Sequence, residues 1–159
     1  MPKEEEKKKI ENIIENIRKL SNSGIKVRYL LPKFPDRLYI GYVYVKAGAE
    51  VRYSSCLLVN DVRYMVIDDE YVLVGIPEVS GETEATKKGY KIPSKGFARI
   101  LKEHYYNCWE HNISYEDYIG EIITQIKSTN PNISFEVLGR ELNLDIDELI
   151  RIDKKLAGI

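Results

Sequence analysis

Apolar residues near the start of the chain recur with the period of an α-helix. The spacing is i, i+3, i+4, i+7, in Ile10, Ile13, Ile14 and Ile17. This spacing places the four side chains on one face of a helix. Charged residues fill the positions between them. Gly24 follows a short polar stretch and can adopt the left-handed conformation that often ends a helix. The pattern therefore predicts a helix over residues 3–20.

The next part of the chain is rich in β-branched and aromatic residues, which are typical of strands. The expected strands cover residues 25–31, 38–46, 51–59, 62–67 and 71–76. Asn60–Asp61 fits a two-residue hairpin turn and 68–70 a slightly longer turn, so the last four strands are expected to form an antiparallel meander. With this register one sheet face is apolar, and the other is mixed and carries Arg52, Arg63, Met65 and Leu73.

Helical patterns return after a polar loop at residues 80–89. An N-cap residue stands before each of four amphipathic segments, and these residues are Ser94, Ser114, Ser134 and Asp145. The first of these helices runs to about Asn112, and Asn130–Pro131 stops the second. The predicted class is α+β, with an N-terminal helix, an antiparallel meander of four to five strands and four helices. We expect an α+β domain at 1–112 and a three-helix unit at 113–159, with packing of the two as one domain as the alternative.

The last two predicted helices carry a characteristic set of small, turn and apolar residues. Gly139 is the small residue inside the first of them, and Asn143 stands at the turn, where positive φ is needed. The apolar offsets are filled by Leu138, Leu142, Leu144, Leu149 and Ile152. Residues 134–156 thus resemble the helix-turn-helix motif shared by many DNA-binding regulators and winged-helix domains, with 115–128 as the supporting helix.

The resemblance implies that the last helix is a recognition helix for DNA. A recognition helix usually presents Arg, Lys, Asn or Gln near its N-terminus. This helix begins with Asp145, Asp147 and Glu148, which would repel phosphates. We therefore expect this unit to bind a protein partner or a second copy of the chain, through Asp147, Glu148 and Arg151.

Charge is distributed unevenly along the chain. Residues 81–112 contain six basic and four acidic residues, whereas residues 113–159 contain five basic and nine acidic residues. The window 87–102 has no acid, and its helical part places Lys95, Arg99 and Lys102 on one face with Tyr106. This stripe is a candidate track for nucleic-acid phosphates. The expected contacts are Lys87, Lys88, Lys91, Lys95, Arg99, Lys102 and Tyr106, with Arg52 and Arg63 on the mixed sheet face.

Other candidate chemistry is weaker. His104, Cys108 and His111 share one face of the predicted helix, and with Cys56 they have the residue types of a zinc site. The commoner outcome is a buried cysteine beside two histidines at the helix edge, so no metal or other cofactor is expected. Asp68, Asp69 and Glu70 at a hairpin tip are expected to face water.

Composition places the protein among intracellular globular proteins. The chain is 43% hydrophobic and 31% charged, and it has no apolar run long enough for a membrane span and no signal-peptide pattern. Two cysteines are too few for a disulfide framework, which favours a reducing, cytoplasmic location. The chain contains a single glutamine, Gln125, and many Ile, Lys and Glu residues. This amino-acid composition is similar to that of thermophilic proteins.

We interpret the sequence as that of a non-catalytic DNA-binding protein that acts in replication or transcription, with nucleic acid and a protein as partners and no membrane. One alternative is an accessory subunit of a larger nucleic-acid-processing complex, such as a primase, that contacts nucleic acid weakly. A second alternative is an enzyme whose site is assembled in space, because catalytic residues need not be neighbours in sequence.

Overall fold

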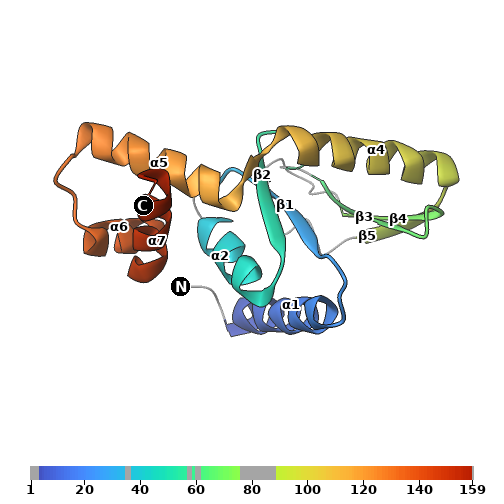
Figure 1. Cartoon of the computed structure of the whole chain (residues 1–159). Helices are drawn as coiled ribbons and strands as arrows, with labels where there is room; N and C mark the ends of the chain where they lie inside the picture. Colours follow the sequence, from blue (N-terminus) through green and yellow to red (C-terminus); the bar gives the residue numbers. More distant parts are fainter. Residues whose placement is uncertain (1–3, 35–36, 57–58, 60–61, 76–88, 159) are drawn as a thin grey trace. The chain divides into compact units, whose positions relative to one another are not determined.

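The computed structural model describes residues 4–34, 37–56, 59, 62–75 and 89–158 (Figure 1). The chain forms two compact units. We call residues 1–29, 33–53 and 113–159 the helical unit, and residues 30–32 and 54–112 the sheet unit. The α+β class expected from the sequence is confirmed. Within the described residues, no helix combines the length and the apolar character that crossing a membrane requires.

The helical unit consists mainly of α1 (Glu4–Asn22), α2 (Arg37–Ala47), α5 (Tyr115–Thr129), α6 (Phe135–Leu142) and α7 (Ile146–Leu156). Helix α1 packs against α2, α2 contacts α5, and α7 contacts both α5 and α6. A small sheet has the order β1-β2-β6, in which β2 pairs antiparallel with β6. Its strands are β1 (Arg28–Pro32), β2 (Glu50–Ser54) and β6 (Ile113–Ser114), and residues 30–32 of β1 and Ser54 of β2 belong to the sheet unit.

Large apolar side chains form the core of the helical unit. Tyr53 is completely buried, and its hydroxyl donates a hydrogen bond to the carbonyl oxygen of Arg37 at 2.9 Å. A Cβ atom at Gly41 would lie 2.0 Å from that hydroxyl, so the glycine makes room for the ring. The other side chains with almost no exposure are Ile17, Leu38, Ile119, Ile123, Leu138, Leu149 and Ile152.

The expected strand over 38–46 is wrong, because these residues form helix α2. The segment alternates tyrosine and valine, and this local preference for strand is overridden by tertiary packing. Leu38, Gly41, Tyr44 and Ala47 are the buried positions, and their spacing of three residues is that of a helical face.

The sheet unit contains a meander with the order β3-β4-β5, formed by β3 (Arg63–Ile67), β4 (Tyr71–Gly75) and β5 (Gly89–Pro93). Helix α4 (Lys95–His111) lies along one face of this sheet (Figure 1). The core between them contains the buried residues Val72, Val74, Ala98 and Leu101. The turn over 68–70 is confirmed, with left-handed φ angles at Asp68 and Asp69.

The meander differs from the expected one in its strands. Strand β2 ends at Ser54 and pairs with β6, so it is not a neighbour of β3. The expected turn at Asn60–Asp61 lies outside the described residues. Strand β5 was not expected, because Gly89 and Pro93 bound only five residues with weak alternation.

The boundaries of the units also differ from the expected division at 112/113. That boundary does separate the two units, but residues 1–29 and 33–53 join the C-terminal helices. The reason is that α2 packs against α5 and β2 pairs with β6, contacts between distant parts of the sequence.

Candidate functional site

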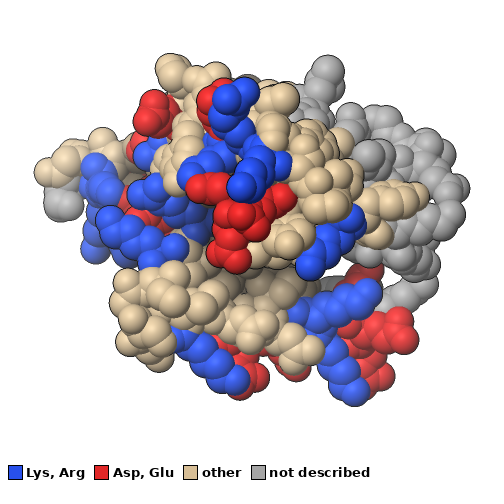
Figure 2. Space-filling view, turned by 90° about the vertical axis from the view of Figure 1, so that its right-hand side faces the viewer, with Lys and Arg blue, Asp and Glu red and all other residues tan. Residues whose placement is uncertain are grey.

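The basic residues of α4 are partly neutralised by the turn between β3 and β4. The Lys102 ammonium lies 2.9 Å from a carboxylate oxygen of Asp69, and the hydrogen bond and charge of Asp69 raise the pKa of Lys102. Lys95 lies 3.6 Å from a carboxylate oxygen of Glu70. Acidic and basic groups are interspersed on the face shown in Figure 2. The α4 stripe is therefore a mixed surface, and Lys87 and Lys88 lie outside the described residues.

The other face of the β3-β4-β5 sheet, which we call the open face, has a different character. The register places Arg63, Met65, Tyr71, Leu73 and Lys91 on this face, opposite the side covered by α4. Met65 is 59% exposed and Leu73 37% exposed, values that are high for such side chains on a strand. None of the described strand residues on this face is acidic.

Two basic residues of the open face are thus combined with apolar and aromatic groups. The Lys91 ammonium lies 4.6 Å from the centre of the Tyr71 ring, which is a cation–π contact. A shallow depression of about 480 Å³ is lined by Arg63, Met65, Leu73 and Lys91 among others. Arg52, expected beside Arg63, lies on β2 in the other sheet, so the two do not share a sheet face.

The turn between α6 and α7 has the local geometry expected from the sequence. Asn143 has the left-handed angles φ 52° and ψ 45°, and a Cβ at Gly139 would lie 2.9 Å from the carbonyl oxygen of Leu144. Close packing at this turn therefore requires a residue without a side chain at position 139. The N-caps at Ser94, Ser114, Ser134 and Asp145 are all confirmed by side-chain hydrogen bonds to backbone N–H groups.

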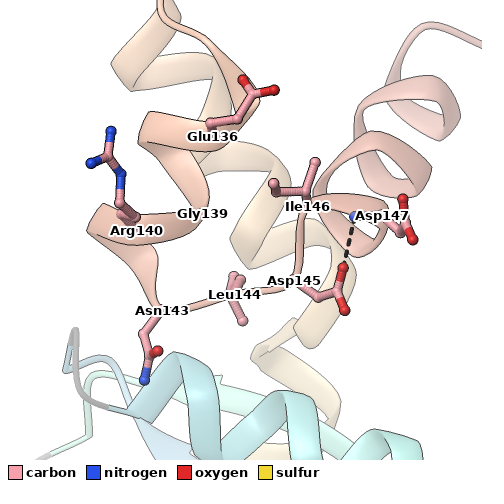
Figure 3. A pocket seen from close by; sticks show the side chains of 8 residues that line it. All are labelled: Glu136, Gly139, Arg140, Asn143, Leu144, Asp145, Ile146 and Asp147. Atoms are coloured by element: carbon pink, nitrogen blue, oxygen red, sulfur yellow. Dashed lines mark hydrogen bonds between the residues drawn. The ribbon is translucent and has the colours of Figure 1, made fainter.

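An open depression of about 670 Å³ lies beside this turn (Figure 3). Its charged lining residues are Glu136, Arg140, Asp145 and Asp147, so acidic groups outnumber the single arginine. Asp145 caps α7 by accepting a hydrogen bond from the N–H of Asp147 at 2.9 Å. Asp147 is exposed at the first turn of α7.

Glu148 and Arg151, the other residues expected to bind a partner, interact inside the helical unit. The Glu148 side chain is only 4% exposed, and Arg151 donates to it at 2.6 Å. The Tyr115 hydroxyl donates to the same carboxylate at 3.4 Å, and Lys46 lies 3.7 Å away. Burial alone raises the pKa of Glu148, but these partners together hold it below its ordinary value. Glu148 therefore stabilises the fold instead of facing a partner.

A cluster of two thiols and an imidazole lies in the sheet unit. His104 and Cys108 are one turn apart on α4, and Cys56 follows β2. The His104 Nε2 atom is 3.3 Å from Cys56 Sγ and 3.4 Å from Cys108 Sγ. His111 does not join them, because it is exposed and its Nδ1 contacts the carbonyl oxygen of Asn107 at 2.9 Å. We call Cys56, His104 and Cys108 the thiol–imidazole cluster.

Two further contacts hold this cluster in place. The Tyr64 hydroxyl is 3.0 Å from His104 Nδ1, and the Cys56 N–H donates to the buried Ser54 hydroxyl at 3.0 Å. Burial, followed by the nearby thiols and Tyr105, raises the pKa of Tyr64, so its hydroxyl is neutral. The helical spacing of His104 and Cys108 is visible in the sequence, whereas the approach of Cys56 depends on the fold.

Comparisons of the chain with protein-family models, with curated proteins and with solved structures found no significant match. The assignment of function therefore depends on the geometry and chemistry of the residues themselves.

Proposed function

We propose that the protein is a non-catalytic nucleic-acid-binding protein that binds single-stranded nucleic acid on the open face of the sheet unit. The observation that carries the proposal is the combination of Arg63 and Lys91 with exposed apolar side chains on a strand face without acids. Cations attract the phosphates, aromatic side chains can stack on bases, and exposed aliphatic side chains give the bases an apolar surface to contact.

The shape of the open face favours single strands over a duplex. Five-residue strands are about 17 Å long, and three of them span about 10 Å. The four-stranded sheet of one class of RNA-binding domain accommodates two or three unstacked bases, so a three-stranded face offers room for a similarly short stretch. Met65 and Leu73, which project from neighbouring strands, would contact these bases.

The α4 stripe contributes less to binding in this proposal. Lys95 and Lys102 are close to Glu70 and Asp69, so a phosphate would have to compete with a carboxylate for each lysine. Lys91 instead contacts the Tyr71 ring. The ring carries no net charge, so this contact does not neutralise the Lys91 ammonium.

The test is a titration of labelled single-stranded and double-stranded DNA of equal length at two salt concentrations. We expect tighter binding to the single strand, and a decrease in affinity as salt increases. The double variant Arg63→Glu/Lys91→Glu should lose on the order of tenfold in affinity, with the salt slope reduced by about 0.7 for each lost phosphate contact.

The matched control is Lys95→Glu/Lys102→Glu, which makes the same change in net charge on α4. We expect a smaller loss for this control. Equal losses in the two variants, or no binding at low salt, would show that the open face is not a nucleic-acid site. Circular dichroism checks that both variants are folded.

A second candidate function concerns the C-terminal helices. We propose that α5, α6 and α7 form a unit of helix-turn-helix type that docks a basic segment of a protein partner, as an accessory subunit would. Close packing at Gly139 and the left-handed Asn143 support the motif, and the acidic depression in Figure 3 supports a basic ligand.

This second candidate is tested by following backbone amide resonances while an arginine- and lysine-rich peptide is added. We expect shifts at the α6–α7 turn that disappear in Glu136→Lys/Asp147→Lys. Shifts confined to other segments, or shifts at this turn on addition of DNA, would contradict the docking role.

A further inference from the structure

The thiol–imidazole cluster has the donor set and the spacing of a zinc site. In a tetrahedral site with Zn–S bonds of about 2.3 Å and Zn–N bonds of about 2.0 Å, the ligand sulfur and nitrogen atoms lie about 3.5 Å apart. The two sulfur–nitrogen distances here are 3.3 and 3.4 Å, and the three donor atoms all lie within 4.8 Å of one another. The two sulfur–nitrogen distances are therefore close to those of a tetrahedral zinc site.

We propose that Cys56, His104 and Cys108 bind one zinc ion, with a water molecule as the fourth ligand. Binding releases the two thiol protons, so that two thiolates neutralise the charge of the metal. Two sulfur donors and an imidazole favour zinc over magnesium or calcium, which prefer oxygen ligands. This proposal is independent of the proposed nucleic-acid function.

Tyr64 acts as a positioning residue for the metal ligand. Metal-bound histidines usually donate their second ring N–H to a neighbouring oxygen, which fixes the tautomer. The Tyr64 hydroxyl oxygen lies 3.0 Å from His104 Nδ1 and can accept a hydrogen bond from that N–H. Nε2 then carries the free lone pair, and this is the ring nitrogen that lies 3.3 Å and 3.4 Å from the two sulfur atoms.

Hydrogen bonding alone explains the cluster less well. In this tautomer Nε2 has a single lone pair, which can accept a proton from one thiol, yet both sulfur atoms approach it to nearly the same distance.

An ion at this site would also stabilise the sheet unit. The unit has about 60 residues, a size at which metal ions commonly add stability. Cys56 and His104 are 48 positions apart in sequence, so an ion between them would close a long loop of the unit.

The experiment uses the full-length chain, purified under reducing conditions and stripped with a chelator, and then titrated with Co²⁺ and Zn²⁺. We expect one Co²⁺ per chain, a thiolate-to-cobalt charge-transfer band, and visible d–d bands of tetrahedral intensity that zinc abolishes. Absence of the charge-transfer band overturns the proposal. A Cys56–Cys108 disulfide that persists under the reducing conditions of the purification also overturns it.

Variants identify the ligands. Cys56→Ser, Cys108→Ser and His104→Ala should each lose the tetrahedral spectrum, and the matched control His111→Ala on the same helix should keep it. Tyr64→Phe should keep the spectrum but lower zinc affinity on the order of tenfold. A full spectrum in Cys56→Ser or His104→Ala, or its loss in His111→Ala, overturns the assignment. The titration of the wild-type chain requires no substitution. It can therefore contradict the proposal even if one of the variants fails to fold.

Discussion

In the helical unit a buried carboxylate is surrounded by positive groups, whereas in the sheet unit two thiols surround an imidazole. Glu148 has Arg151, Lys46 and the Tyr115 hydroxyl as partners, so its charge is compensated. In the thiol–imidazole cluster the contacts of His104 are with two sulfur atoms and a tyrosine hydroxyl. The carboxylate is thus compensated within the chain, whereas the thiol–imidazole cluster offers the sulfur and nitrogen donors on which our zinc proposal rests.

The surface charges show a second contrast. In the helical unit Glu116 pairs with both Arg151 and Lys155, and its side chain is 29% exposed. In the sheet unit Lys102 and Asp69 are 44% and 68% exposed. The cations that pair with Glu116 are themselves 46% and 67% exposed, so solvent screens both sets of ion pairs. The Glu148–Arg151 pair, in which the carboxylate is only 4% exposed, is therefore the pair that we expect to contribute most to stability.

The largest expected effect comes from Glu148→Ala, which should lower the free energy of unfolding by about 2 kcal/mol. The substitution leaves the Tyr115 hydroxyl without its acceptor and removes one carboxylate from Arg151. Urea unfolding followed by circular dichroism measures the change. Glu116→Ala is the matched control, because this carboxylate is more exposed and should cost less. A cost for Glu148→Ala no larger than that of the control would contradict the comparison.

The same carboxylates predict acid sensitivity. Hydrogen bonds from Lys155 and Arg151 lower the pKa of Glu116, and the pKa of Glu148 is also below its ordinary value. Their stabilisation is complete above the ordinary carboxyl pKa, about 4, and is lost as the pH falls through the lower folded-state values. In Glu148→Ala the free energy of unfolding should therefore decrease less steeply as the pH is lowered below the ordinary carboxyl pKa.

An intermediate effect is expected at the α6–α7 turn. Asn143→Ala should cost about 1 kcal/mol, because alanine tolerates the left-handed conformation less well than asparagine. Asn143→Gly is the control and should leave the stability nearly unchanged or slightly raised. Thermal unfolding of the two variants gives the comparison, and equal stability of the alanine and glycine variants would argue against a strained turn.

The smallest effect is expected from Lys102→Met, which should leave the unfolding midpoint of the sheet unit unchanged within error. Both partners of the Lys102–Asp69 pair are exposed, so its loss is compensated by water. Trp109, the single tryptophan, is buried on α4 and reports unfolding of this unit by fluorescence. A decrease in stability as large as that caused by Glu148→Ala would contradict the expected difference between the exposed ion pair and the buried one.

Several features were determined by the sequence alone, because they depend on neighbours along the chain. The N-caps, the left-handed Asn143 and the small Gly139 are local hydrogen-bonding and steric requirements, and the structure confirms them. The i, i+4 spacing of His104 and Cys108 likewise follows from the helix that contains them.

Only the tertiary structure decided the features that depend on distant partners. Helix α2 has strand-like residues, and its helical state depends on packing against α1 and α5. Tertiary contacts likewise determine that β2 pairs with β6, which sets the position of Arg52. They also bring Glu148 into its buried ion pair with Arg151. The position of Cys56 beside His104 joins residues 48 positions apart, and no local rule determines such a contact, because it depends on the free energy of the whole core.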